Sequence, residues 1–164
     1  MSMAIATTFS RIAGLVRDVV VARMFGAGFA TDAFFMAFTI PNLLRRFFGE
    51  GSLTAAFVPT FAEVYQQQGE KEAQKLANRC VTMLLLVMLI VVSIGVLASP
   101  WIVRGIGYGF ADVPGKLELT NFLNQLMFPY IGLVSMLALL TGILNVHGHF
   151  FLPSLSPLFL NISM

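Results

Sequence analysis

The chain has 164 residues, of which 57% are hydrophobic and only 11% are charged, and its mean hydropathy is +0.84. Soluble domains carry about a quarter charged residues, so this composition excludes an ordinary soluble protein and indicates an integral membrane protein. The formal net charge of +2 is too small to indicate binding to nucleic acid. The single cysteine, Cys80, excludes an internal disulfide.

The first predicted membrane span covers residues 4–24 and carries a polar stripe. On a helix, residues spaced three, four and seven apart share one face. The polar and charged residues that share this face are Thr7, Ser10, Arg11, Arg17 and Asp18. A charge inside the bilayer costs a few kcal/mol or more, so such residues mark a cavity, a substrate path or an ion pair. Because Arg11 and Arg17 also interrupt the apolar run, we do not expect a cleaved signal peptide.

A second helix is predicted over residues 31–67, which is too long for one straight span. Pro41 removes a backbone hydrogen bond and the glycines that follow loosen the next turns, so we expect a kinked or broken helix. This helix carries its own polar stripe, which contains Asp32, Asn42, Arg46 and Glu50, with Arg45 beside it. Thr31 suits an N-cap, and Asp32 suits the first turn, where an acidic side chain faces the positive end of the helix dipole.

Two longer apolar segments follow a polar run at residues 66–75, which we expect to be a solvent-exposed loop or helix end. Residues 80–103 contain no charged side chain and predict a span that is compatible with lipid on all sides. Residues 104–118 predict a turn-rich loop, and residues 119–146 predict a fourth span. The last apolar run, 150–164, is short for a span, so we expect an incomplete fifth span and a truncated chain.

Charges in the loops leave the orientation in the membrane undecided. Cytoplasmic loops carry an excess of lysine and arginine. One end of the predicted bundle carries Lys71, Lys75 and Arg79, and the other carries Arg23, Arg104 and Lys116. Counting Arg45 and Arg46 with the first group would make that end cytoplasmic, whereas placing them in a cavity leaves the two ends equal.

A series of short motifs runs along the chain. In its first third these are Ser10-Arg-Ile-x-Gly14-x-x-Arg17-Asp18, Arg23-x-Phe-Gly-Ala-Gly28, Thr31-Asp-Ala-Phe-Phe35, Pro41-Asn-Leu-Leu-Arg-Arg46 and Glu50-Gly51. Later motifs are Ala56-Phe-Val-Pro59, Ala98-x-Pro-Trp101, Phe128-Pro-Tyr130, Ile143-Leu-Asn145 and Pro157-x-x-x-Asn161-Ile-Ser163. Together they resemble the N-terminal signature of the MurJ (MviN) lipid II flippases, and the resemblance covers the whole chain.

The resemblance implies an all-α membrane protein, a polytopic helical bundle that forms the N-terminal part of a transporter lobe. The superfamily would be that of the multidrug, oligosaccharidyl-lipid and polysaccharide exporters (MOP superfamily). The implied function is to move lipid II, an undecaprenyl diphosphate-linked peptidoglycan precursor, across the bacterial cytoplasmic (inner) membrane by alternating access. The implied partners are lipid II, membrane lipids and the missing C-terminal helices of the parent flippase, with no nucleic acid, metal, cofactor or enzymatic activity.

The same resemblance implies a substrate site. Family arginines that hold the diphosphate match Arg11, Arg17 and Arg45, and the neighbouring cavity positions are Ser10, Asp18, Asp32, Asn42, Arg46 and Glu50. A diphosphate needs a wet path along which guanidinium groups replace its water. The four arginines exceed the three carboxylates by one charge. We hypothesise that the carboxylates hold the arginines and compete with the substrate, which keeps binding weak enough for release.

Plainer interpretations of these residues stay open. Arg11 and Asp18 can form a structural pair, Arg45 and Arg46 can anchor the chain at the membrane interface, and Asp32 can serve only the helix start. For the chain as a whole, the alternatives are a flippase or exporter of another polyprenyl-linked saccharide or drug, and a small membrane scaffold protein. Because most of a flippase is absent, we expect the 164-residue chain to be an inactive fragment.

Overall fold

The computed structural model describes residues 8, 11–12, 14–16, 19–20, 23–24, 26, 28–49 and 52–150. Within these residues the structure is helical and contains no strand. The elements are α2 (Phe29–Gly49), α3 (Ser52–Gln68), α4 (Glu70–Ile106), the short 3-10 helix η1 (Tyr108–Phe110) and α5 (Lys116–Val146). The predicted incomplete span, apart from residue 150, lies outside the described residues.

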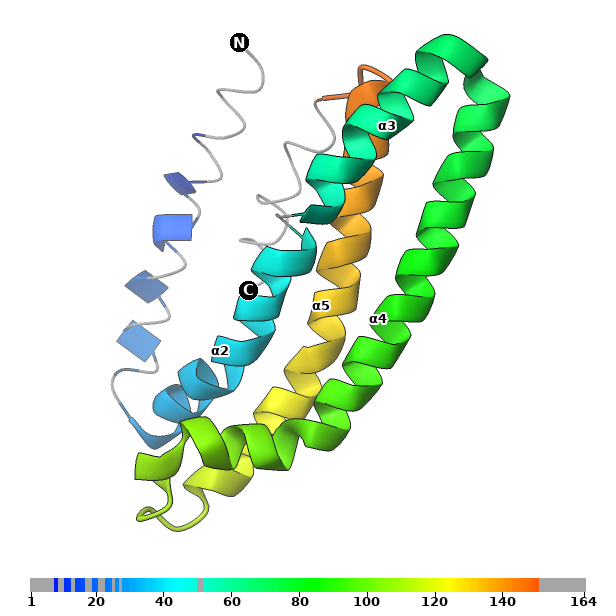
Figure 1. Cartoon of the computed structure of the whole chain (residues 1–164). Helices are drawn as coiled ribbons and strands as arrows, with labels where there is room; N and C mark the ends of the chain where they lie inside the picture. The colour runs from blue at the N-terminus through cyan, green and yellow to red at the C-terminus, as the bar shows by residue number, and fades with distance from the viewer. Residues whose placement is uncertain are drawn as a thin grey trace.

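Helix α5 is the central element of the bundle. In Figure 1, α2 lies along one side of α5, α4 runs antiparallel to α5 on the other side, and α3 crosses the end of α5 toward α4. Helix α5 packs against both α2 and α4, which contact each other little. The bundle is therefore held together through α5.

The helices begin and end at different residues from those that hydropathy alone indicates. Helix α4 contains the predicted span 80–103 but begins at Glu70, because the polar residues before the apolar run continue the helix. The polar run 66–75 thus contains a helix end, a turn at Gly69 and a helix start. Gly69 has φ 84°, a left-handed conformation that glycine adopts without a steric penalty. Helix α2 begins at Phe29, and the Asp32 N–H donates to the Gly28 carbonyl at 2.9 Å, so Thr31 lies inside the helix.

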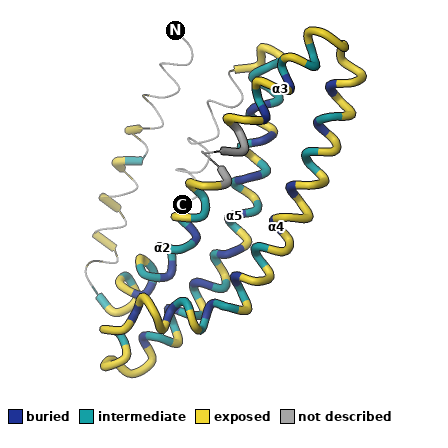
Figure 2. The backbone as a smooth tube through the Cα atoms, in the orientation of Figure 1, coloured by how far each residue is buried: buried dark blue, intermediate teal, exposed yellow. Residues whose placement is uncertain are grey.

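The core consists of buried apolar side chains of α3, α4 and α5, with Ile40 and Leu44 of α2 packed against it. Its members include Phe57, Phe61, Leu84, Met88, Phe128, Ile131 and Leu139. The outer side of α4 is apolar as well but exposed, as the yellow stretches along this helix in Figure 2 show. Among the described residues, α4 and α5 are the two helices that are long and apolar enough to cross a membrane. This surface suits contact with lipid rather than with water.

Candidate functional site

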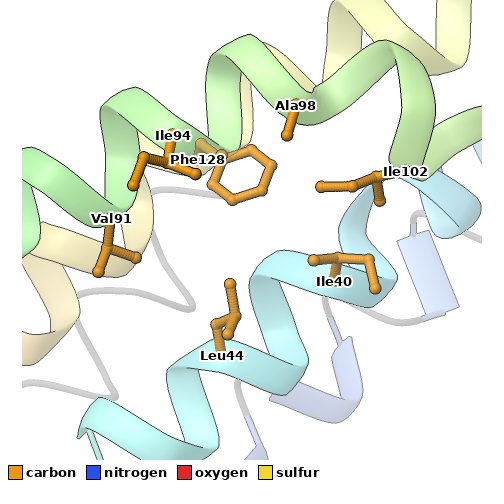
Figure 3. A pocket seen from close by; sticks show the side chains of 8 residues that line it. Ile40, Leu44, Val91, Ile94, Ala98, Ile102 and Phe128 are labelled. Atoms are coloured by element: carbon orange, nitrogen blue, oxygen red, sulfur yellow. The ribbon is translucent and has the colours of Figure 1, made fainter.

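Arg45 and Arg46 lie near the middle of the bundle, not at its end. Leu44, the residue before them, lines an apolar groove of about 250 Å³ together with Val91 and Ile94 of α4, as Figure 3 shows. Val91 and Ile94 occupy the centre of the charge-free segment 80–103. When this segment crosses a bilayer, the backbone of Arg45 and Arg46 lies at the depth of the hydrocarbon layer. This position disfavours the interpretation of Arg45 and Arg46 as interface anchors.

Three of the predicted site residues lie together on α2. Arg45 Nε donates a hydrogen bond to Asn42 Oδ1 at 3.2 Å, which is the one-turn contact expected for residues three apart. Arg45 and Asn42 are half-buried, and Arg46 is exposed. Asn42 therefore orients the guanidinium plane of Arg45, while Arg46 points away from the core beside it.

Asp32 is far from these arginines and has a different partner. Its Oδ2 lies 2.8 Å from Nζ of Lys116, the first residue of α5. The Lys116 ammonium also lies 4.1 Å from the ring centroid of Phe110. At a rise of about 1.5 Å per residue, Asp32 is about 20 Å from Arg45 along α2, too far for one diphosphate to contact both. Lys116, counted as a loop charge from the sequence, is thus a structural partner of Asp32.

Of the five remaining predicted site residues, Arg11 is the one that the structure describes. Arg11 lies in a helical stretch and is exposed. The described apolar residues near it are exposed too, namely Ile12, Leu15, Val16, Val19 and Val20. Ser10, Arg17, Asp18 and Glu50 lie outside the described residues, so their place in the cavity stays a prediction.

Sequence reasoning missed a buried polar cluster between α2, α4 and α5. Asn124 is fully buried, its Nδ2 donates to the Ala37 carbonyl at 2.6 Å, and its Oδ1 accepts from Ser99 Oγ at 2.9 Å. Asn121 Oδ1 lies 2.8 Å from the same Ser99 hydroxyl and shares its one hydrogen with Asn124 Oδ1, and Gln125 Nε2 donates to the Val96 carbonyl at 3.3 Å. The sequence could have indicated this cluster, since Asn121, Asn124 and Gln125 place three amide side chains within five residues of an apolar span. Such side chains form hydrogen bonds between membrane helices.

Comparisons with known proteins agree on one family. A family model described as lipid II flippase MurJ matches residues 21–164. The probable lipid II flippase MurJ of Buchnera aphidicola subsp. Acyrthosiphon pisum is 40% identical over 163 residues, which cover 99% of this chain and 32% of the relative. The lipid II flippase MurJ of Burkholderia cenocepacia is 38% identical over 157 residues, which cover 96% of this chain and 30% of the relative.

A solved structure gives the same result. The structure of a lipid II flippase MurJ in an inward closed conformation superposes with a TM-score of 0.76 at 34% identity, covering 98% of this chain and 33% of that one. The chain thus spans about a third of the length of the relatives it matches. The predicted all-α membrane bundle and the predicted family are confirmed. The chain belongs to the lipid II flippase MurJ family.

Proposed function

We propose that this chain supplies part of the diphosphate path of a lipid II flippase. The proposal is supported by the depth of Arg45 and Arg46 in the membrane. Both residues follow Leu44, which lines the groove together with Val91 and Ile94. Charges at this depth require water, an ionic partner or an anionic substrate. Guanidinium groups suit a diphosphate because their planar donors can form two parallel hydrogen bonds to phosphate oxygens.

In this proposal Arg11 lies at the same height in the membrane as Arg45. Arg11 and Arg45 lie equally far along the chain from Gly28, one before it and the other after it. In two antiparallel helices joined near Gly28, residues equally distant from the connection lie at equal heights, because both helices rise by the same amount per residue. Arg11 and Arg45 would then approach one diphosphate from two helices.

The carboxylates divide into two roles in this proposal. Asp32 is engaged by Lys116 and lies well away from Arg45, so it serves the structure of the bundle. Competition with the substrate for the arginines then falls to Asp18 and Glu50. When carboxylates take the place of the phosphate beside the arginines, release of lipid II is favoured. The empty site can then face the inner side of the membrane again. The proposed process moves lipid II from the inner to the outer leaflet of the bacterial inner membrane, with no covalent chemistry.

The test is a chimera in which this chain replaces the segment that it matches in the Burkholderia cenocepacia relative. The chimera should bind lipid II and restore growth in cells depleted of their own flippase. Arg45→Glu should abolish binding, measured by native mass spectrometry, because the new carboxylate repels the diphosphate. Arg17→Glu should do the same. Arg104→Glu is the matched control, since Arg104 is an exposed arginine in the last turn of α4, and it should bind as the unmodified chimera does.

Two results would count against this proposal. Unchanged binding of lipid II by Arg45→Glu would remove the diphosphate role. Displacement of lipid II by a cationic drug, but not by undecaprenyl diphosphate, would favour a drug exporter. The excess of arginines predicts the opposite, because guanidinium groups attract an anionic ligand and repel a cationic one.

A further inference from the structure

The missing N–H of Pro41 leaves a carbonyl in α2 that Asn124 of α5 satisfies. In an α-helix each N–H bonds to the carbonyl four residues earlier, and proline has no N–H. Pro41 lies inside α2, so the Ala37 carbonyl lacks its helical donor. Asn124 Nδ2 donates to this oxygen at 2.6 Å, and both residues are completely buried. Inside a membrane no water can satisfy this carbonyl, so the hydrogen bond from Asn124 holds α2 against α5.

The orientation of the Asn124 amide is itself fixed. A carbonyl oxygen can only accept a hydrogen bond, so the Asn124 atom that lies 2.6 Å from the Ala37 carbonyl is Nδ2, and Oδ1 faces Ser99 Oγ of α4 at 2.9 Å. The Ser99 hydroxyl also lies 2.8 Å from Asn121 Oδ1 and is fully buried. Asn124 therefore has one possible amide orientation in this cluster, and that orientation serves the Ala37 carbonyl.

The hydrogen bond from Asn124 to the Ala37 carbonyl holds in place a row of α2 residues that ends at Arg45. Ala33, Ala37, Pro41 and Arg45 are spaced by four, so each lies next to the one before it on the helix surface, turned by about 40° around the axis. The first three are buried against the bundle, and Arg45 is the half-buried continuation of the row. The distance of Arg45 from α5 thus depends on how closely α2 is held at Ala37, two turns earlier.

We propose that Asn124 is a positioning residue for the Arg45 guanidinium, acting through the carbonyl that Pro41 leaves without a donor. The inference rests on the proposed function, in which Arg45 contacts the diphosphate. Without the Asn124 amide, the Ala37 carbonyl must find another donor, and α2 must move away from α5 to reach one. Arg45 moves with it, and the geometry needed for paired hydrogen bonds to phosphate is lost.

The next residue of α5 provides a matched control. Pro100 lies inside α4 and leaves the Val96 carbonyl without its helical donor, and Gln125 Nε2 donates to that carbonyl at 3.3 Å. The chemistry equals that of Asn124, but the helix that Gln125 serves carries none of the predicted site residues. Loss of either amide should weaken the packing of the bundle, whereas only the loss of Asn124 should lower the affinity for lipid II.

The experiment uses the chimera and measures affinity for lipid II together with the thermal unfolding temperature. Asn124→Leu should weaken binding about tenfold, as expected when the displaced Arg45 guanidinium loses one hydrogen bond to phosphate. Gln125→Leu should lower the unfolding temperature yet keep the affinity. Pro41→Ala restores an N–H that can serve the Ala37 carbonyl. In that background Asn124→Leu should therefore change the affinity by less than about twofold.

Each outcome decides the proposal. Wild-type affinity in Asn124→Leu, or an equally large loss in the Pro41→Ala background, would overturn it. If Asn124→Leu does not fold, the double variant should fold, because its carbonyl has a backbone donor, and failure of both variants would also overturn it. The two proposals fail separately: unchanged binding in Arg45→Glu refutes the diphosphate site, whereas loss in Arg45→Glu with none in Asn124→Leu refutes only the positioning role.

Discussion

The ion pair between Asp32 and Lys116 is unequal in its exposure to solvent, and this inequality predicts which partner matters more. The Lys116 side chain is 10% exposed and that of Asp32 is 49% exposed. Removing the carboxylate leaves a mostly buried ammonium with the Phe110 ring beside it, while removing the ammonium leaves a carboxylate that water can reach. Loss of Asp32 should therefore be the more costly change.

We expect Asp32→Asn to lower the free energy of unfolding by about 1–3 kcal/mol, less than for a fully buried pair because Asp32 is half exposed. Lys116→Met should cost about 0–1 kcal/mol. Combining both substitutions should recover most of the loss, since no charge is then left unpaired. Denaturant titration in detergent micelles measures all three. A larger loss in the double variant than in Asp32→Asn would show that the pair is not the reason for the effect.

The predictable residues are those whose chemistry is visible in a single helix. Asn42 and Arg45 share one turn of α2, so their contact follows from spacing alone. The bond from Asn124 to the Ala37 carbonyl could not be predicted in this way, because it joins residues 87 apart in sequence. It depends on α5 lying between α2 and α4, which helical periodicity does not determine. The same holds for the partner of Asp32.

At the scale of elements, α4 and α5 approach so closely at Gly95 that no side chain fits there. A Cβ atom at this position would lie 2.0 Å from Phe128 Cε1, and Phe128 is only 1% exposed. The ring borders the apolar groove of Figure 3, so it must turn into that groove and leave its packed position to admit a methyl group. Elsewhere on α4 the situation differs, since a Cβ at Gly105 would meet no atom within 4 Å.

Gly95→Ala should therefore lower the free energy of unfolding by about 1–3 kcal/mol, the usual cost of overpacking a core. Gly105→Ala should be neutral or stabilising, because alanine favours a helix over glycine by about 1 kcal/mol. The two variants introduce the same methyl group into one helix, so their difference isolates the contact with Phe128. Equal stability of both variants, measured by denaturant titration in micelles, would contradict the packing of α4 on α5.

Hydropathy locates elements well where charges are absent and poorly where a helix leaves the apolar layer. The charge-free segment 80–103 lies inside α4, as a lipid-compatible span should. The ten residues before it are polar and helical, and no hydropathy rule separates a polar helix end from a loop. Pro41 is likewise tolerated inside α2, since the neighbouring α5 supplies the missing donor.

For the whole molecule, the length of α4 indicates how the bundle crosses the membrane. The path of its 37 residues is about 55 Å long, and because the helix bends in its C-terminal part (Figure 1), the straight part before the bend is what crosses the roughly 30 Å of hydrocarbon in a bilayer. The turn at Gly69 and the segment 107–115 lie at opposite ends of the bundle (Figure 1). These two connections should therefore face the aqueous phases on opposite sides of the membrane.

Labelling of single cysteines tests this arrangement in a Cys80→Ser background. Gln67→Cys and Asp112→Cys replace exposed residues at the two ends, and a membrane-impermeant maleimide should reach them from opposite sides of sealed vesicles. Leu89→Cys should stay unlabelled from either side. Its position is 66% exposed on the bundle but faces lipid, where the reactive thiolate does not form. Labelling of both end positions from one side would mean that α4 does not span the bilayer, and Arg45 would then lose the mid-membrane depth on which its role depends.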